Sequence, residues 1–154
     1  MLILLLAAHI LAALFWVGGM AFAYTMLRPA AGALEASARL TLWRDVFKRF
    51  LPWVAVSIAA LLISGYAMMF LVYGGFHRAP LFVHVMQGTG ILMMLLYLHL
   101  YFAPWQRLQK TVAAAEWQSA GKHLAMIRKL VAINLVLGIV TVLVGSTGRF
   151  WQAM

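Results

Sequence analysis

The strongest constraint in this sequence is a set of four long stretches without a single charged residue. They are Leu2–Leu27, Phe50–Phe76, Ala79–Gln106 and Leu130–Gly148. Each stretch is close to or above the roughly 20 residues that an α-helix needs to cross the hydrocarbon core of a bilayer. The sequence therefore predicts an all-α integral membrane protein, a bundle of four transmembrane helices. The predicted spans cover about residues 2–27, 50–74, 81–104 and 130–148.

Composition excludes a water-soluble fold and narrows the possible metal ligands. Hydrophobic residues make up 66% of the chain and charged residues only 10%, against roughly 25% charged residues in soluble globular domains. At this length we expect a single transmembrane domain over residues 1–154. The chain has no cysteine, which excludes disulfides, thiolate-ligated metals and a Cys-x-x-Cys-His haem attachment. A metal site must therefore use histidine, methionine or oxygen ligands.

The lysines and arginines predict how the bundle is oriented. Ten of the twelve lie in the first and third connections between the apolar stretches: Arg28, Arg39, Arg44, Lys48, Arg49, Arg107, Lys110, Lys122, Arg128 and Lys129. Positive charge near membrane spans marks the cytoplasmic side, so both termini are expected outside the cytoplasm. The sequence predicts a multi-pass protein of the bacterial inner (plasma) membrane. The net charge of +9 is expected to face lipid headgroups, so the bilayer, and not nucleic acid, is the predicted partner.

The first connection has a pattern of its own. Apolar side chains such as Leu40, Trp43 and Phe47 recur at helical spacing, opposite basic residues. This predicts an amphipathic helix over about residues 36–49 that lies flat on the inner leaflet. The third connection is expected to extend the third helix and to break near Gly121.

Two histidines are the leading candidates for a cofactor site, because polar groups inside a membrane usually face the bundle interior. His9 and His84 lie ~12 Å and ~6 Å from the outer side of their helices. Two imidazoles at similar depth can ligate haem b from both sides. Gly88 leaves room one turn after His84, and Arg78 and Arg149 can bind propionates at the outer boundary. The alternative is that the histidines only hydrogen-bond across helices and the arginines are ordinary interface residues.

Met86 and His99 are secondary candidates. The chain has ten methionines, and thioether sulfur suits Cu(I), although methionine is also a common core filler. Met86 is the methionine of interest because it lies close to His84. His99 lies ~22 Å farther along the same helix. It can bind a second haem, line a quinone pocket or point to the inner headgroups. We predict that it points to the inner headgroups.

Small and polar residues form stripes on two of the predicted helices. Asn134, Gly138, Thr141 and Gly145 share one face of the fourth span, and Ser57, Ser64 and Gly65 share one face of the second. Such stripes predict close helix packing. The only carboxylates, Glu35, Asp45 and Glu116, lie in the cytoplasmic connections. This distribution argues against hydrolysis and against the usual kind of proton-coupled transporter.

Several short motifs together resemble a known family. They are the run His9-Ile-Leu-Ala-Ala-Leu-Phe-Trp16-Val17-Gly18-Gly19-Met20-Ala-Phe22, then Leu27-Arg28-Pro29, Arg49-Phe50, Gly65, His84-Val85-Met86 and Asn134-Leu-Val-Leu-Gly138. The chain resembles the copper-resistance protein D (CopD) family over nearly its whole length. That resemblance implies a role in copper uptake or tolerance.

The first helix is also distantly similar to the HemJ-type protoporphyrinogen oxidases, which implies a haem b protein. His9 matches the histidine that this second family links to haem binding. The position of the family's third-helix lysine holds Met86. This departure argues against protoporphyrinogen oxidase activity.

Three functional hypotheses follow from these observations. The first is a membrane-embedded b-type haem protein that passes electrons from a membrane-soluble donor, a quinol or porphyrinogen, to an acceptor near the outer face. The second is a copper transport or tolerance protein in which His9, His84 and Met86 pass Cu(I). The third is a non-catalytic membrane scaffold subunit. The sequence leaves open whether the protein is an enzyme and whether it is a homo-oligomer.

Overall fold

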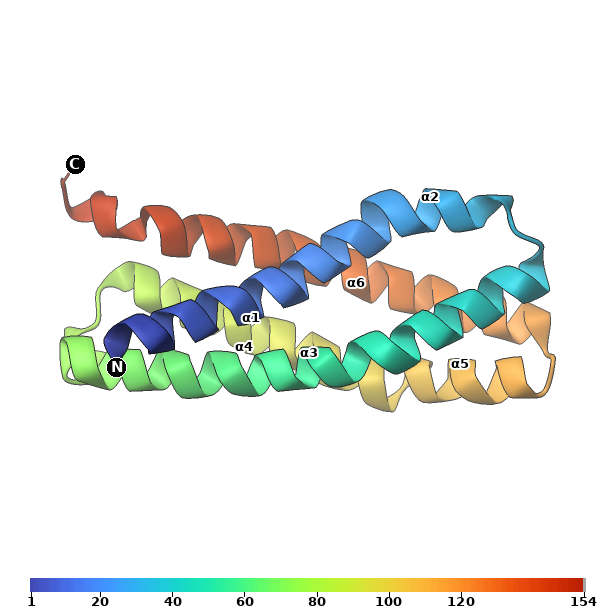
Figure 1. The fold of residues 1–154 in the computed structure, drawn as a ribbon, viewed down its shortest axis with the longest axis horizontal. Coiled ribbons are helices and arrows are strands. Elements are labelled where there is room, and N and C mark those ends of the chain that lie inside the picture. The colour runs from blue at the N-terminus through green and yellow to red at the C-terminus, as the bar shows by residue number, and fades with distance from the viewer. Residues whose placement is uncertain (154) are drawn as a thin grey trace.

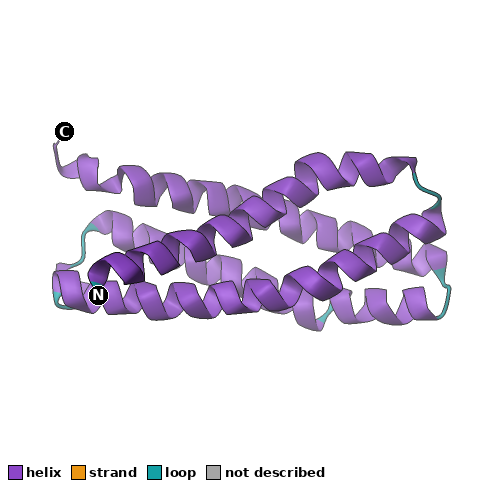
Figure 2. Ribbon diagram, in the orientation of Figure 1, coloured by secondary structure: helices purple, strands orange, loops and turns teal. Residues whose placement is uncertain are grey.

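The protein is a bundle of long helices that run along one axis (Figure 1), as described by a computed structural model covering residues 1–153. The α-helices are α1 (Leu2–Phe22), α2 (Arg28–Ala30), α3 (Ala36–Tyr73), α4 (Leu81–Phe102), α5 (Pro104–Ala113) and α6 (Trp117–Thr147). Short helical turns join or extend them: η1 (Ala23–Leu27), η2 (Ala31–Ala33), η3 (Phe76–Arg78) and η4 (Gly148–Ala153). Over these residues the chain is helical apart from short loops (Figure 2).

Four helical stretches are long and apolar enough to cross a membrane in the part of the chain that the structure describes. They are Leu2–Ala33, Ala36–Tyr73, Leu81–Ala113 and Trp117–Trp151. The predicted all-α membrane bundle of four helices is therefore confirmed. The chain is a multi-pass membrane protein, consistent with a bacterial inner membrane.

The bundle has two distinct ends. The start of α1, the connection between α3 and α4 and the end of α6 lie together at one end (Figure 1). The connections from α2 to α3 and from α5 to α6 lie at the other. Following the orientation predicted from the basic residues, we call the first the outer end and the second the inner end. Met154, whose position outside the cytoplasm was predicted, lies outside the described residues.

The first connection differs from the expectation of a flat interfacial helix. Residues 36–49 do not form a separate helix but are the first part of α3, which continues through Pro52 to Tyr73. Their apolar face is buried in the bundle: the Phe47 ring packs edge-on against Trp105 of α5, with ring centroids 6.1 Å apart. The amphipathic pattern was therefore read correctly as a helix, but protein rather than lipid covers its apolar face.

The third connection also has a different break from the expected one. α4 ends at Phe102 and α5 starts at Pro104, where a proline is favourable because the first turn of a helix needs no N–H donor. The chain then turns between α5 and α6 at Ala115, which has a φ of 55°. Gly121, the expected break, lies inside α6. A single glycine costs a helix only about 1 kcal/mol relative to alanine, so it does not end α6.

The large buried side chains gather in the inner half of the bundle. This core combines aromatic and aliphatic residues from all four long segments, including Trp16, Trp43, Tyr97, Trp105 and Leu108. The Tyr97 hydroxyl donates a hydrogen bond to the backbone carbonyl of Leu51 at 3.0 Å and so ties α4 to α3. Towards the outer end the helices associate mainly as two pairs, α1 with α3 and α4 with α6. These pairs carry the predicted site residues.

Candidate functional site

His9 lies on the face of α1 that packs against α3. Its Nδ1 is 2.9 Å from Oγ of Ser64, and the Ser64 hydroxyl donates to the carbonyl of Ala60 one turn earlier. A serine hydroxyl has one proton to donate, so Ser64 accepts from the Nδ1–H of His9. In a neutral imidazole this arrangement assigns the proton to Nδ1 and leaves Nε2 with a lone pair that can ligate a metal.

Gly65 allows the His9 ring to lie directly on α3. A Cβ added at Gly65 would be 3.1 Å from Cε1 of His9, closer than a normal contact. The neighbouring Ser64 is buried, with 2% of its surface exposed. The predicted packing role of this small stripe on α3 is therefore confirmed, and His9 is the residue that it accommodates.

The stripe on α6 packs against α4 in the same way. Asn134 donates through Nδ2 to the carbonyl of Met93 at 3.3 Å, and Oγ1 of Thr141 lies 2.7 Å from Oγ1 of Thr89. At Gly145 an added Cβ would lie 2.9 Å from Cε of Met86. The predicted close packing of this stripe is confirmed as well.

Two methionines of α4 face α6 along this contact. Met86 packs on Gly145, and Sδ of Met93 is 3.9 Å from the hydroxyl of Thr141. Met86 is half-buried and Met93 is buried. The sequence analysis singled out Met86 and not Met93, although their spacing of seven residues places both on one helix face.

His84 lies on a different face of α4. It lies two positions before Met86, which turns it about 200° away around the helix. Its side chain is exposed, as is Gly88, and an added Cβ at Gly88 would meet no atom within 4 Å. Among the described residues, the hydrogen bond of the His9 side chain is to Ser64 and not to His84. Haem ligation by this pair remains a prediction.

The remaining predicted residues lie at the ends of the bundle. Arg78 in η3 and Arg149 in η4 are both exposed at the outer end, with the Arg149 guanidinium 4.6 Å from the centre of the Phe150 ring. His99 is exposed in the last turn of α4. The propionate role of the arginines and the headgroup position of His99 remain predictions. Over residues 1–153, no group of three or more His, Cys, Asp or Glu side chains forms a metal-binding cluster.

Comparison with known proteins gives one match. The family model described as Copper resistance protein D matches residues 44–147, about two thirds of the chain. This region contains Met86 and Met93 but begins after His9. No curated protein and no solved structure matches the chain.

Proposed function

The chain belongs to the copper-resistance protein D family, and from this premise we propose that it binds Cu(I) inside the membrane and carries it across or into the bilayer. The observation that carries the proposal is the pair Met86 and Met93, whose thioethers face the small and polar stripe of α6. Thioether sulfur is a preferred ligand of Cu(I). The two methionines lie about 10 Å apart along the helix axis. They would therefore be successive Cu(I)-binding positions between the outer end and the middle of the bundle.

His9 supplies a nitrogen ligand in the outer half of the same bundle. Its Nε2 is free because Ser64 holds Nδ1, and neutral imidazole suits copper. The three carboxylates lie in the predicted cytoplasmic connections, so no carboxylate is expected beside the ion within the membrane. Neutral sulfur and nitrogen ligands would have to offset the free-energy cost of desolvating the cation there.

The test is a Cu(I) titration of the detergent-purified protein against a competing Cu(I) chelator. We expect Met86→Leu and Met93→Leu each to weaken Cu(I) binding about tenfold, the effect of losing roughly 1.4 kcal/mol of ligand interaction. Met and Leu have similar volumes, so the substitutions preserve packing. Met126→Leu is the matched control because Met126 is exposed on α6, and its affinity should equal that of the native protein.

Unchanged Cu(I) affinity in the double variant Met86→Leu/Met93→Leu would contradict this proposal. His9→Ala is expected to weaken binding as well, with His123→Ala as its control. Uptake of copper into vesicles that contain the native protein would establish movement in addition to binding. Colourless protein that binds no copper would instead favour a scaffold role, alone or as a homo-oligomer.

A second candidate function is a b-type haem protein that takes electrons from a quinol or porphyrinogen. One observation favours it: the free Nε2 of His9 is as suitable for haem iron as for copper. The exposed His84 would have to supply the second ligand, with Arg78 and Arg149 near the propionates. The arrangement of these four residues around one haem is a proposal.

A reduced-minus-oxidised absorbance spectrum of purified protein, made with ample haem supply, tests this second candidate. Haem binding predicts a Soret band that shifts on reduction and is lost in His9→Ala and in His84→Ala. The band should persist in His123→Ala, which replaces a histidine in the predicted cytoplasmic part of α6. A native protein without a Soret band would exclude haem b as its cofactor.

A further inference from the structure

Three arginines from separate segments lie close together at the inner end. Arg28 belongs to α2, Arg39 to α3 and Arg128 to α6. Arg28 and Arg39 are near enough for their positive charges to act on Arg128. Over the described residues the single ion pair is Arg44 with Asp45, so none of these three arginines has a carboxylate partner. The bundle therefore concentrates unbalanced positive charge at this point.

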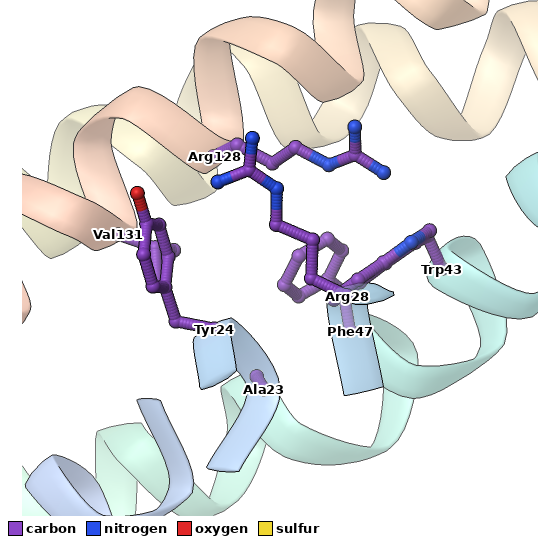
Figure 3. A pocket seen from close by; sticks show the side chains of 7 residues that line it. All are labelled: Ala23, Tyr24, Arg28, Trp43, Phe47, Arg128 and Val131. Atoms are coloured by element: carbon purple, nitrogen blue, oxygen red, sulfur yellow. The ribbon is translucent and has the colours of Figure 1, made fainter. Parts of the chain in front are cut away.

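Two of these arginines line a small pocket between η1, α3 and α6 (Figure 3). The guanidinium of Arg128 lies 5.5 Å from the ring centre of Trp43, and that of Arg28 lies 5.0 Å from the ring centre of Tyr24. In Figure 3 the two arginine side chains cross at the pocket, with the Arg28 guanidinium on the Tyr24 side and the Arg128 guanidinium on the Trp43 side. Phe47 and Val131 supply an apolar lining. Charged groups thus meet in a partly apolar setting, where electrostatic interactions are stronger than in water.

Two of the residues that line this pocket each carry a buried hydrogen-bond donor without an acceptor. Nε1 of Trp43 is buried and has no hydrogen-bond partner, and only 3% of the residue is exposed. Nε of Arg128 is also buried without a partner. A buried donor left unpaired costs free energy. The donors and charges together call for a ligand that is anionic and rich in acceptor oxygens.

We propose that this pocket binds a phosphate group, held by Arg28 and Arg128 and by the indole N–H of Trp43. Arginine forks match phosphate oxygens in charge and geometry, and the indole N–H can only donate. The pocket lies beside the inner end of the predicted spans, at the depth of lipid headgroups. A phosphate there can come from an anionic lipid or from a soluble phosphate compound. This site is separate from the Cu(I) ligands and does not depend on the copper proposal.

The binding experiment uses the full chain in detergent, with native mass spectrometry to count bound phosphatidylglycerol relative to phosphatidylcholine. We expect retained phosphatidylglycerol, with affinity about tenfold or more lower in the double variant Arg28→Gln/Arg128→Gln. Trp43→Phe keeps the ring and removes only the donor, so it should weaken binding while the protein stays folded. Arg107→Gln is the matched control, since Arg107 is an exposed arginine of the inner end outside the pocket.

A second titration with inorganic phosphate separates the two sources. Phosphate binding that is lost in Trp43→Phe, without preferential retention of phosphatidylglycerol, would assign the site to a soluble phosphate compound. Retained phosphatidylglycerol with no phosphate binding would assign it to a lipid headgroup. The proposal is overturned if neither probe binds, or if Arg107→Gln lowers binding as much as the pocket variants do.

Discussion

Leu108→Ala is expected to lower the free energy of unfolding by about 2–5 kcal/mol, the usual cost of truncating a fully buried leucine. Leu108 belongs to α5, and its side chain is 0% exposed. α5 extends past the apolar part of α4 and carries the exposed basic residues Arg107 and Lys110. We expect water around the exposed basic side of this helix, so the hydrophobic effect should act on Leu108 as it does in a soluble protein.

Leu143→Ala is the matched control for this prediction. Leu143 is 57% exposed on the apolar part of α6, where its neighbour outside the bundle is lipid. Lipid tails are as apolar as leucine, so its truncation removes little driving force for folding. Thermal unfolding of both variants in the same detergent would measure the difference. Equal stability of the two variants would contradict the view that α5 closes a water-excluding core at the inner end.

Gly138→Leu is expected to destabilise the protein by about 1–3 kcal/mol through overpacking. An added Cβ would lie 2.8 Å from Cγ2 of Val17 on α1 and 3.2 Å from Cε of Met93 on α4. Three helices therefore meet at this glycine, and a side chain would have to push two of them away. Because Met93 would also move, Cu(I) binding should weaken together with stability.

The control for Gly138→Leu is Gly88→Leu on α4. An added Cβ at Gly88 meets no atom within 4 Å, so stability should change by about 0.5 kcal/mol or less. Both variants place the same side chain in a membrane-spanning helix, and only the local space differs. Comparing the unfolding midpoints of the two variants tests the expectation that Gly138→Leu is the less stable. Equal losses would show that leucine destabilises any glycine position in these helices, independent of helix contact.

The sequence predicted the helices and their packing stripes better than it predicted their rotations. Uncharged runs and small residues at helical spacing are local signals, and they identified the contacts made by Gly65 and Gly145. Which neighbour each face meets depends on the arrangement of all the helices. His84 illustrates this limit: its expected depth is similar to that of His9, but its face of α4 is exposed while Met86 turns towards α6.

The amphipathic segment at residues 36–49 is a second case in which the sequence did not determine what covers a helix face. An apolar stripe opposite basic residues fits a helix on a lipid surface and a helix on a protein surface equally well. The structure distinguishes them because α5 and α6 extend beyond the apolar spans and cover Trp43 and Phe47. The sequence predicts that the third helix extends into the third connection, but no residue pattern indicates that this extension contacts residues 36–49.

Large buried side chains are concentrated in the inner half of the bundle, so we expect the two helix pairs to move least relative to each other there. The two helix pairs are held together there by aromatic rings and by the hydrogen bond from Tyr97 to Leu51. Near the outer end, Nε2 of Gln87 on α4 donates a hydrogen bond to the hydroxyl of Tyr66 on α3 at 3.2 Å, which links the two helix pairs. If the protein carries Cu(I) as proposed, the outer half, with fewer large buried side chains, is where we expect the helix pairs to separate.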